Sequence, residues 1–285
     1  MKVLVTGSSG YIGRHVVGEL LKRGHNVIAS DMALDAYYIG DSNVVQTQEN
    51  IFSGAPDIFE KLGRPDVLIH LAWEAGFVHN SHLHMQKLSE HVRFLSDMIK
   101  GGLTDVAVMG SMHEVGFFEG AVTADTPCNP LSLYGVAKNA LRQAMMIEST
   151  SQDFRLYWLR AYYIYGDDQR GSSIFAKITQ AASEGKRIFP FTTGQNKYDF
   201  IHIDELARQI VSAATQDRET PENIITGIIN TCSGEPVSLA EQVETFIREN
   251  GFDIELEYGV FPDRAYDSKE IWGDDELIRE ILAKE

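Results

Sequence analysis

The first thirteen residues constrain the fold of this chain more than any other stretch. Met1 to Gly13 reads MKVLVTGSSGYIG, with an apolar strand over Lys2 to Val5, glycines at Gly7, Gly10 and Gly13, and then the start of a helix. Such glycines let the backbone approach a phosphate, and the free N–H groups of a helix N-terminus favour negative charge. The alternative is an ordinary tight turn. The flanking strand and helix favour a dinucleotide pyrophosphate site.

Apolar strands and amphipathic helices alternate along the chain as far as Arg160. We expect strands at 26–30, 43–46, 67–71, 105–109 and 155–159, and helices at 11–22, 81–100 and 133–149. Strands that are continuously apolar and separated by helices predict a parallel sheet covered on both faces. The fold class is therefore α/β, a Rossmann-type doubly wound parallel sheet.

The pattern loosens beyond Arg160. We expect helices at 173–183, 204–214, 238–249 and 274–282, and strands at 187–191, 198–203, 228–231 and 254–258. The predicted organisation is a dinucleotide-binding domain over 1–165 and a smaller C-terminal substrate-binding lobe over most of 166–285. Elements near 198–232 are expected to return to the first domain.

Composition excludes several classes of protein. The net charge of −16 argues against a nucleic-acid partner or an anionic membrane surface. Cys128 and Cys232, the two cysteines, make neither a disulfide framework nor a metal-ligand cluster, and we assign the scattered histidines at 79–91 to a solvated helix face rather than a metal site. With no leader and no apolar run near the ~20 residues of a membrane span, we expect a soluble cytoplasmic protein without a metal.

Asp31 closes the second predicted strand and bears on the choice of cofactor. A carboxylate there can accept hydrogen bonds from the adenosine ribose and would repel a 2′-phosphate, which favours NAD over NADP. The alternative is an aspartate in a strand-end turn. Arg14, on the first helix, could reach a 2′-phosphate or lie solvated, so NADP stays possible.

Tyr134 and Lys138 are four residues apart on a predicted helix and therefore share a face. A lysine ammonium near a phenol favours the phenolate and should lower the tyrosine pKa towards working pH, so that the pair can move a proton to or from a carbonyl or alcohol oxygen. Ser111 follows the predicted strand at 105–109, at the sheet edge where ligands bind. The alternative for Ser111 is a turn or capping serine.

Seven motifs along the chain carry a family resemblance. They are T-G-S-S-G-Y-I-G at 6–13, D-V-L-I-H-L-A at 66–72, S-x-x-x-x-G at 111–116, N-P-L-S-L-Y-G-V-A-K at 129–138, L-R-A-Y-Y-I-Y-G at 159–166, D-F-I-H-I-D-E at 199–205 and S-G-E-P-V-S-L at 233–239. Together they resemble the extended short-chain dehydrogenase/reductases of the NAD-dependent epimerase/dehydratase group, which act on nucleotide sugars. The resemblance covers nearly the whole chain.

The resemblance implies roles for individual residues. Tyr134 would be the catalytic acid/base, Lys138 would tune it and bind the nicotinamide ribose, and Ser111 would hydrogen-bond the reacting oxygen. Cofactor contacts are implied for Gly7, Ser9, Gly10, Tyr11, Ile12, Gly13, Asp31, Asn50, Ile51, Leu71, Ala72, Trp73, Tyr134 and Lys138. Substrate contacts are implied for Ser111, Met112, His113, Tyr163 and Arg264.

Departures from the family pattern narrow the reaction. The 4,6-dehydratases of this group carry an Asp-Glu pair after the catalytic hydroxyl residue, where this chain has Met112 and His113, so we do not expect dehydration. The group's 3,5-epimerase/reductases have a cysteine and a histidine where His113 and Asp168 stand. His113 either hydrogen-bonds substrate or is a packed loop histidine.

The substrate side also departs from the pattern. Many relatives bind the diphosphate with an asparagine and an arginine at the positions of Tyr163 and Tyr198. Arg264 is then the best cationic candidate for the diphosphate, and a solvated surface arginine is the alternative.

Three functions follow from the resemblance. The first is reduction of the 4-keto group of a nucleotide-linked 4-keto-6-deoxyhexose, for example dTDP-4-keto-6-deoxyglucose, in deoxysugar and polysaccharide biosynthesis. The second is a 4-epimerase with tightly held NAD, and the third is a non-catalytic dinucleotide sensor, which the presence of both Tyr134 and Lys138 disfavours. The group also commonly forms homodimers through two long helices, here 81–100 and 133–149.

Overall fold

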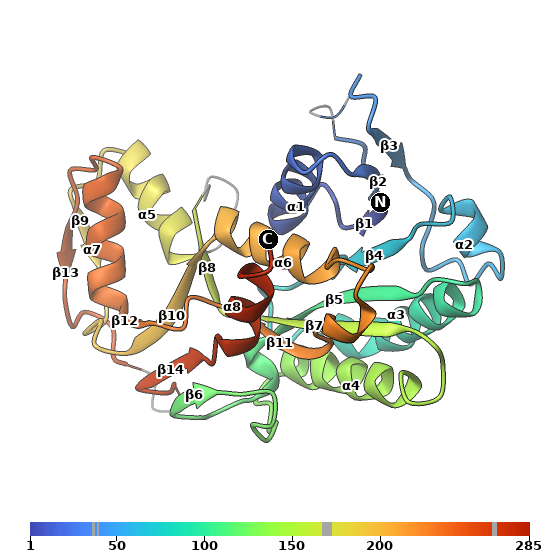
Figure 1. Cartoon of the computed structure of the whole chain (residues 1–285). Coiled ribbons are helices and arrows are strands. Elements are labelled where there is room, and N and C mark those ends of the chain that lie inside the picture. The colour runs from blue at the N-terminus through green and yellow to red at the C-terminus, as the bar shows by residue number, and fades with distance from the viewer. Residues whose placement is uncertain (36–37, 39, 167–172, 264–266) are drawn as a thin grey trace.

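The computed structural model describes residues 1–35, 38, 40–166, 173–263 and 267–285. Its larger part is a seven-stranded sheet in the order β11-β7-β5-β4-β1-β2-β3, with every neighbouring pair parallel (Figure 1). The strands are β1 (Lys2–Thr6), β2 (Asn26–Ser30), β3 (Val44–Thr47), β4 (Val67–His70), β5 (Asp105–Ser111), β7 (Arg155–Ala161) and β11 (Gly227–Thr231). Because the strand order reverses between β1 and β4, the loops at their carboxyl ends diverge and leave room for a ligand.

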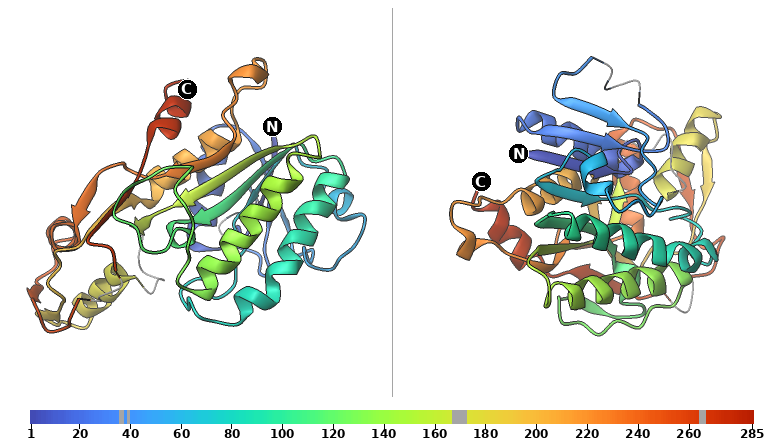
Figure 2. Two further views of the ribbon diagram at one scale, coloured as in Figure 1. Left: turned by 90° about the horizontal axis from the view of Figure 1, so that it is seen from below. Right: turned by 90° about the vertical axis from the view of Figure 1, so that its right-hand side faces the viewer.

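Helices cover both faces of this sheet, as the continuously apolar strands predict. One face carries α1 (Tyr11–Lys22), α6 (Ile203–Ala214) and α8 (Glu276–Leu282), and the other carries α2 (Ile58–Lys61), α3 (Leu83–Lys100) and α4 (Leu133–Glu148). Figure 2 shows α3 and α4 running side by side.

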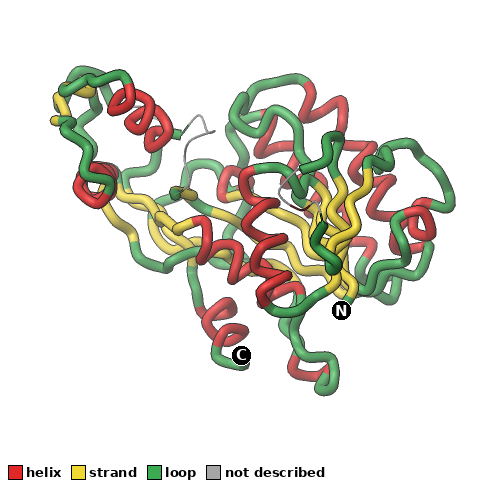
Figure 3. The backbone as a smooth tube through the Cα atoms, turned by 90° about the horizontal axis from the view of Figure 1, so that it is seen from above, coloured by secondary structure: helices red, strands yellow, loops and turns green. Residues whose placement is uncertain are grey.

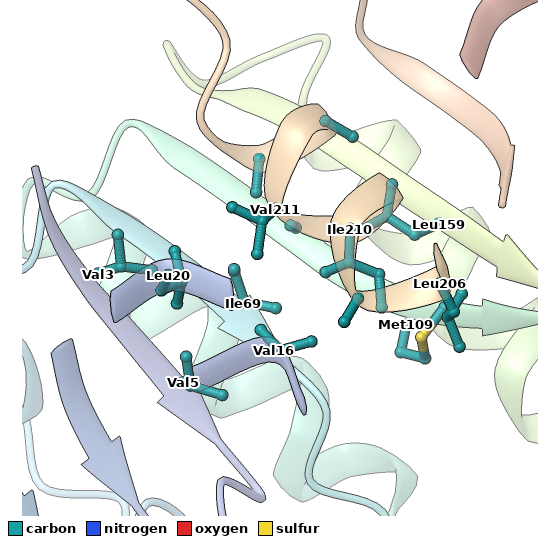
Figure 4. Packing of buried hydrophobic residues seen from close by; sticks show 14 of the residues in the cluster. Val3, Val5, Val16, Leu20, Ile69, Met109, Leu159, Leu206, Ile210 and Val211 are labelled. Carbon is teal, nitrogen blue, oxygen red and sulfur yellow. The ribbon is translucent and has the colours of Figure 1, made fainter. Parts of the chain in front are cut away.

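Side chains alternate between the two covered faces along each strand. Val3 and Val5 of β1 pack into the cluster beneath α1 and α6, where Leu206 and Ile210 also lie (Figure 4). Leu4, between the two valines, packs into the opposite cluster beneath α3 and α4. This period of two explains why a strand buried on both faces reads as an unbroken apolar run.

A smaller lobe stands to one side of the large sheet (Figure 3). Its main sheet has five strands, in the order β12-β10-β14-β6 with β8 paired to β10. The lobe contains β6 (Gly120–Val122), β8 (Tyr163–Tyr165), α5 (Ile174–Ser183), β9 (Ile188–Pro190), β10 (Lys197–His202), β12 (Pro236–Ser238), α7 (Leu239–Glu249), β13 (Glu255–Glu257) and β14 (Glu270–Gly273). The chain therefore crosses between the two parts several times, and the division at residue 165 stays a prediction.

Asp199 of β10 shows how the lobe is joined to the large sheet. Its carboxylate is fully buried and accepts hydrogen bonds from the Ser233 amide at 2.8 Å and the Ser233 hydroxyl at 2.7 Å. The amides of Gly234 and Gly273 donate to the other carboxylate oxygen at 3.0 and 3.1 Å. One side chain thus ties β10 to the turn after β11 and to β14, which gives the D-F-I-H motif a structural role.

None of the helices in the described part of the chain has the length and hydrophobicity needed to span a membrane.

Candidate active site

The glycine turn between β1 and α1 matches the geometry of a pyrophosphate site. Gly7 has a φ of 71°, in the left-handed region that favours glycine. A Cβ on Gly7 would lie 2.8 Å from the Ala72 amide nitrogen, and one on Gly13 would lie 2.1 Å from the Gly7 carbonyl oxygen. Gly10 caps α1 without a side-chain hydrogen bond to the first turn. The turn is thus packed tightly against the residues that follow β4, while the N–H groups of α1 keep no side-chain cap, as dinucleotide binding requires.

Asp31 is held beside this turn at the carboxyl end of β2. Its two carboxylate oxygens accept hydrogen bonds from the backbone N–H groups of Ser9, at 2.9 Å, and Met32, at 2.7 Å. The Ser9 hydroxyl donates to the Ala33 carbonyl at 3.1 Å, which anchors the same loop. A fixed carboxylate at this place fits a ribose diol and opposes a 2′-phosphate.

The other predicted cofactor positions gather at the same sheet edge. Asn50 and Ile51 lie in the loop after β3, where the Asn50 side-chain oxygen accepts from the Phe52 amide at 3.0 Å. Leu71 and Ala72 directly follow β4, and Leu71 donates its amide hydrogen to the Thr6 carbonyl at 3.1 Å. On α1, Ile12 packs into the core, and the Tyr11 hydroxyl donates to the Gly166 carbonyl.

Ser111 ends β5 and caps the short 3₁₀ helix η2 (Met112–Glu114). Its hydroxyl oxygen accepts from the His113 amide at 3.3 Å, and its own amide donates to Glu114 Oε1 at 2.7 Å, which completes a capping box. Ser111 is therefore a capping serine, and the same geometry keeps its hydroxyl on the carboxyl edge of the sheet. Its side chain is also hydrogen-bonded to that of Tyr134.

Glu114 is a buried anion behind Ser111 that sequence patterns do not reveal. Trp158 Nε1 donates to both carboxylate oxygens at 3.0 Å, and Oε2 lies 3.6 Å from guanidinium nitrogens of Arg142 and Arg160. Burial raises the pKa of Glu114, while the Arg160 charge and the Ser111 amide oppose that rise. The Glu114 carboxylate therefore acts as an acceptor for N–H groups of Ser111 and Trp158.

Tyr134 sits in the first turn of α4, opposite Ser111. The Ser132 hydroxyl caps α4 by accepting from the Gly135 amide at 3.1 Å, and the Tyr134 amide donates to the His79 carbonyl at 2.8 Å. Burial raises the pKa of Tyr134 to about 12, because desolvation outweighs the hydrogen bond with Ser111. The phenol is therefore protonated at neutral pH and is in the state of a proton donor.

The expectation that Lys138 lowers the Tyr134 pKa towards working pH is wrong for this arrangement. Lys138 Nζ lies 5.9 Å from the Tyr134 ring centroid and donates instead to the Met109 carbonyl at 2.7 Å. Burial also lowers the pKa of Lys138 itself, to about 7. The ammonium is thus a neighbour of the phenol rather than its hydrogen-bond partner.

Four aromatic rings surround the Tyr134 phenol, and three of them are imidazoles. The His79 ring stacks on it with centroids 5.5 Å apart, and His84, His113 and Trp73 approach at 5.3, 5.9 and 6.0 Å. The prediction of a solvated histidine face is wrong here, because His84 and His91 of the 79–91 segment are each only 2% exposed. The apolar core stripe of α3 turns these two histidines inward, towards the site.

The structure brings only some of the predicted substrate residues to Tyr134. His113 is brought to Tyr134, and burial lowers its pKa to about 4, so its imidazole is neutral. Met112 is buried in the apolar cluster of the lobe. Tyr163 packs on Tyr198 with ring centroids 4.3 Å apart, also in the lobe. Arg264, like Asp168, lies outside the described residues.

No cluster of three or more potential metal ligands occurs in the described ranges, which leave out 36–37, 39, 167–172 and 264–266. A parallel sheet with a glycine turn at its switch point, and a serine, a tyrosine and a lysine together at the carboxyl edge, define a short-chain dehydrogenase/reductase. The chain belongs to the NAD dependent epimerase/dehydratase family, whose pattern matches residues 3–228. It is therefore an enzyme whose cofactor is NAD.

Individual relatives support the same placement. The chain is 41% identical to a dTDP-6-deoxy-L-talose 4-dehydrogenase (NAD(+)) of Aggregatibacter actinomycetemcomitans, over 96% of this chain and 99% of that protein. It is 24% identical to a probable UDP-glucuronate 4-epimerase of Rhizobium meliloti, over 86% and 81% of the two chains. Among solved structures, the UDP-glucuronic acid 4-epimerase of Bacillus cereus in complex with UDP-glucuronic acid and NAD superposes with a TM-score of 0.83. That match has 23% identity and covers 100% of this chain and 94% of the other, and it shows the fold.

Proposed function

We propose that this chain is a nucleotide-sugar oxidoreductase that reduces the 4-keto group of a nucleotide-linked 4-keto-6-deoxyhexose, such as dTDP-4-keto-6-deoxyglucose, with NADH. The observation that carries the proposal is geometric: Ser111 at the end of β5 and Tyr134 and Lys138 on α4 meet at the sheet edge that the glycine turn marks. The relative at 41% identity is named for oxidation at C4 of a 6-deoxyhexose. The reverse of that oxidation is reduction of a 4-keto-6-deoxyhexose.

The residues of the site divide the proton chemistry between them. The Ser111 hydroxyl accepts from the His113 amide, and its side chain is hydrogen-bonded to Tyr134. When the ketosugar is bound, the Ser111 hydrogen would donate to the carbonyl oxygen at C4. Tyr134 donates its phenolic proton to the same oxygen as negative charge develops there. The hydride that completes the reduction comes from the reduced nicotinamide when the cofactor is bound.

The chain offers a place for each part of the cofactor. The turn at Gly7 to Gly13 and the N-terminus of α1 would hold the pyrophosphate, and Asp31 would hold the adenosine ribose. Lys138 would reach the nicotinamide ribose from α4, with its charge beside Tyr134. This charge would stabilise the phenolate that proton donation leaves behind.

A 4-epimerase is the second candidate, because relatives with this name share the fold and the sequence pattern. Epimerisation uses the same serine, tyrosine and lysine, with oxidation and re-reduction on one sugar. Dehydration is a weaker candidate, because the residues after Ser111 are the buried Met112 and a neutral His113 rather than two carboxylic acids.

The deciding experiment is turnover of a panel of nucleotide-linked 4-keto-6-deoxyhexoses with NADH and with NADPH, followed by nicotinamide absorbance and by product stereochemistry. We expect stoichiometric NADH consumption by at least one ketosugar. Isomerisation of a nucleotide hexose without net cofactor change would instead identify the epimerase. No turnover with any ketosugar would refute the proposal.

The role of Tyr134 is tested with Y134F. Losing a positioned general acid typically costs a factor of about 100 to 10,000, so we expect at least a 100-fold loss of kcat. Y258F is the matched control, because Tyr258 is a partly exposed tyrosine of the lobe that is hydrogen-bonded to Glu244. Wild-type turnover by Y134F would remove Tyr134 from the mechanism.

A further inference from the structure

Trp73 lies against both Tyr134 and Lys138. It follows β4 in the loop that runs past the glycine turn, and its indole ring lies under the Lys138 ammonium, with Nζ 3.8 Å from the ring centroid. The same indole lies near the Tyr134 phenol, with ring centroids 6.0 Å and planes 80° apart. Trp73 is therefore in contact with one member of the proposed catalytic set and adjacent to another.

Two histidines of α3 hold the indole in this position. The His91 ring stacks on Trp73, with centroids 4.5 Å apart and planes 20° apart. Trp73 Nε1 donates to His84 Nδ1 at 3.1 Å, and His84 Nε2 lies 3.0 Å from the Val78 carbonyl. His84 must then carry its proton on Nε2, because Nδ1 accepts from Trp73. The indole is thus fixed on its face and at its edge.

Lys138 needs such support because, among the described residues, Glu114 is the group that compensates its charge electrostatically. The Lys138 side chain is 3% exposed, and burial lowers its pKa to about 7. Near pH 7, both the ammonium and the amine form of Lys138 are therefore populated. The titratable groups around it are Glu114, Tyr134, His70 and His91. Of these, Glu114 raises the Lys138 pKa.

The other three groups carry no opposite charge. His70 has a pKa well below 6.5 and His91 a pKa of about 3, both chiefly through burial, so both are neutral at pH 7. Tyr134 is a protonated phenol. The aromatic face of Trp73 and the Met109 carbonyl are therefore the direct contacts that favour the charged form of Lys138.

We propose that Trp73 is a positioning residue for Lys138, and that its indole face keeps the lysine ammonium charged and in place beside Tyr134. This inference rests on the proposed function, in which Lys138 acts in catalysis. A cation over the face of tryptophan is favoured most strongly where water is excluded, as it is here.

The direct test is the titration of Lys138 in the protein without cofactor or substrate. Lysine labelled with carbon-13 at the ε position reports protonation by NMR, and the Lys138 signal is assigned by its absence in K138M. W73L removes the aromatic face and should lower the Lys138 pKa by about one unit. W73F keeps an aromatic face and should return the Lys138 pKa most of the way to its wild-type value. H84L leaves the indole in place and tests the hydrogen bond at its edge.

The kinetic test is the pH profile of kcat. If the ammonium is the active form, W73L should move the alkaline limb to lower pH by about the same one unit, with about a fivefold loss of kcat at pH 7. KM for the ketosugar should change less than kcat. W73M, which fills a similar space without an aromatic face, replaces W73L if the leucine variant does not fold.

The outcomes separate this inference from the proposed function. An unchanged Lys138 pKa and an unchanged alkaline limb in W73L or W73M would overturn the role of Trp73. Full turnover by Y134F would overturn the proposed mechanism, and the lysine titration would still decide whether Trp73 supports the charge of Lys138. W73L could also lose kcat while the Lys138 pKa measured by NMR and the pKa of the alkaline limb both stay unchanged. That result would mean that Trp73 only fills space.

Discussion

Replacing Glu114 by glutamine would test how the site depends on one buried charge. Glutamine keeps the shape and one oxygen, so the Ser111 amide can still find its acceptor. It puts an NH₂ group where Oε2 lies, 3.6 Å from guanidinium nitrogens of Arg142 and Arg160. Donors then face donors, and Arg160, which is 0% exposed, loses its counter-ion.

The size of the effect follows from this loss. Removing one partner of a buried ion pair costs about 3 to 5 kcal/mol of unfolding free energy. Because E114Q keeps the hydrogen bond with the Ser111 amide, we expect its loss at the lower end, about 3 kcal/mol. In a chain of this size, about 2 °C of melting temperature is lost per kcal/mol, so we expect a fall of about 6 °C. Catalysis should fall by about tenfold, below the roughly 100-fold cost of a full ångström of misplacement.

The assay combines urea unfolding, thermal melting and kcat for E114Q, with E119Q as the matched control. Glu119 is exposed in the same segment, and its carboxylate lies 3.4 Å from the Lys269 amide, so its charge should matter little. If E114Q unfolds within about 0.5 kcal/mol of wild type, Glu114 and Arg160 do not stabilise each other as described. Full kcat would show that Ser111 does not need the carboxylate behind it.

The remaining predictions concern acid stability, the lobe, the cofactor and assembly. Burial lowers the pKa of His91 from 6.5 to about 3, so between these pH values the unfolded chain takes up a proton that the folded chain does not. The free energy of unfolding should therefore fall as pH drops through this window. In H91Q, urea titrations should show a smaller fall of the unfolding free energy. D199N should cost about 2 kcal/mol in unfolding free energy, since a donor amide replaces one of two accepting oxygens; an unchanged transition would show that the buried carboxylate does not hold the lobe. D31N should lower kcat/KM with NADH and raise it with NADPH, measured as a ratio; an unchanged ratio would exclude Asp31 as the discriminating residue. We also expect a homodimer through α3 and α4, which sedimentation equilibrium measures directly; a monomer at micromolar concentration would contradict it.

Much of the large sheet follows from local patterns. The continuous apolar runs predict β1, β2, β4, β5 and β7 closely, because strands buried on both faces need apolar side chains at most positions. Gly24 ends α1 with a left-handed φ of 76°, and Ser238 caps α7, as their residue types indicate. Short elements such as β6 and β14 carry no such pattern, because pairing with distant strands, rather than their own composition, makes them strands.

The proposed catalytic residues were also visible in the sequence, since the glycine turn, Ser111, Tyr134 and Lys138 each belong to a motif with local spacing. The family resemblance names Trp73 as a cofactor contact, but the contacts by which other groups adjust these residues were not visible. Trp73 and His91 come from different elements, and Glu114 looks like any loop carboxylate until Trp158 and Arg160 are placed around it. The histidines of α3 point inward because the helix packs its apolar stripe on the sheet.

The sequence by itself determined the class of fold, and it predicted the place of the dinucleotide and the three residues proposed to carry the reaction. Only the tertiary structure decided the charge state of that site. Desolvation raises the pKa of Tyr134 from its ordinary value to about 12 and lowers the pKa of Lys138 to about 7. Burial and the orientation of neighbouring rings depend on segments far apart in the chain. The spacing of residues within one helix cannot reveal either.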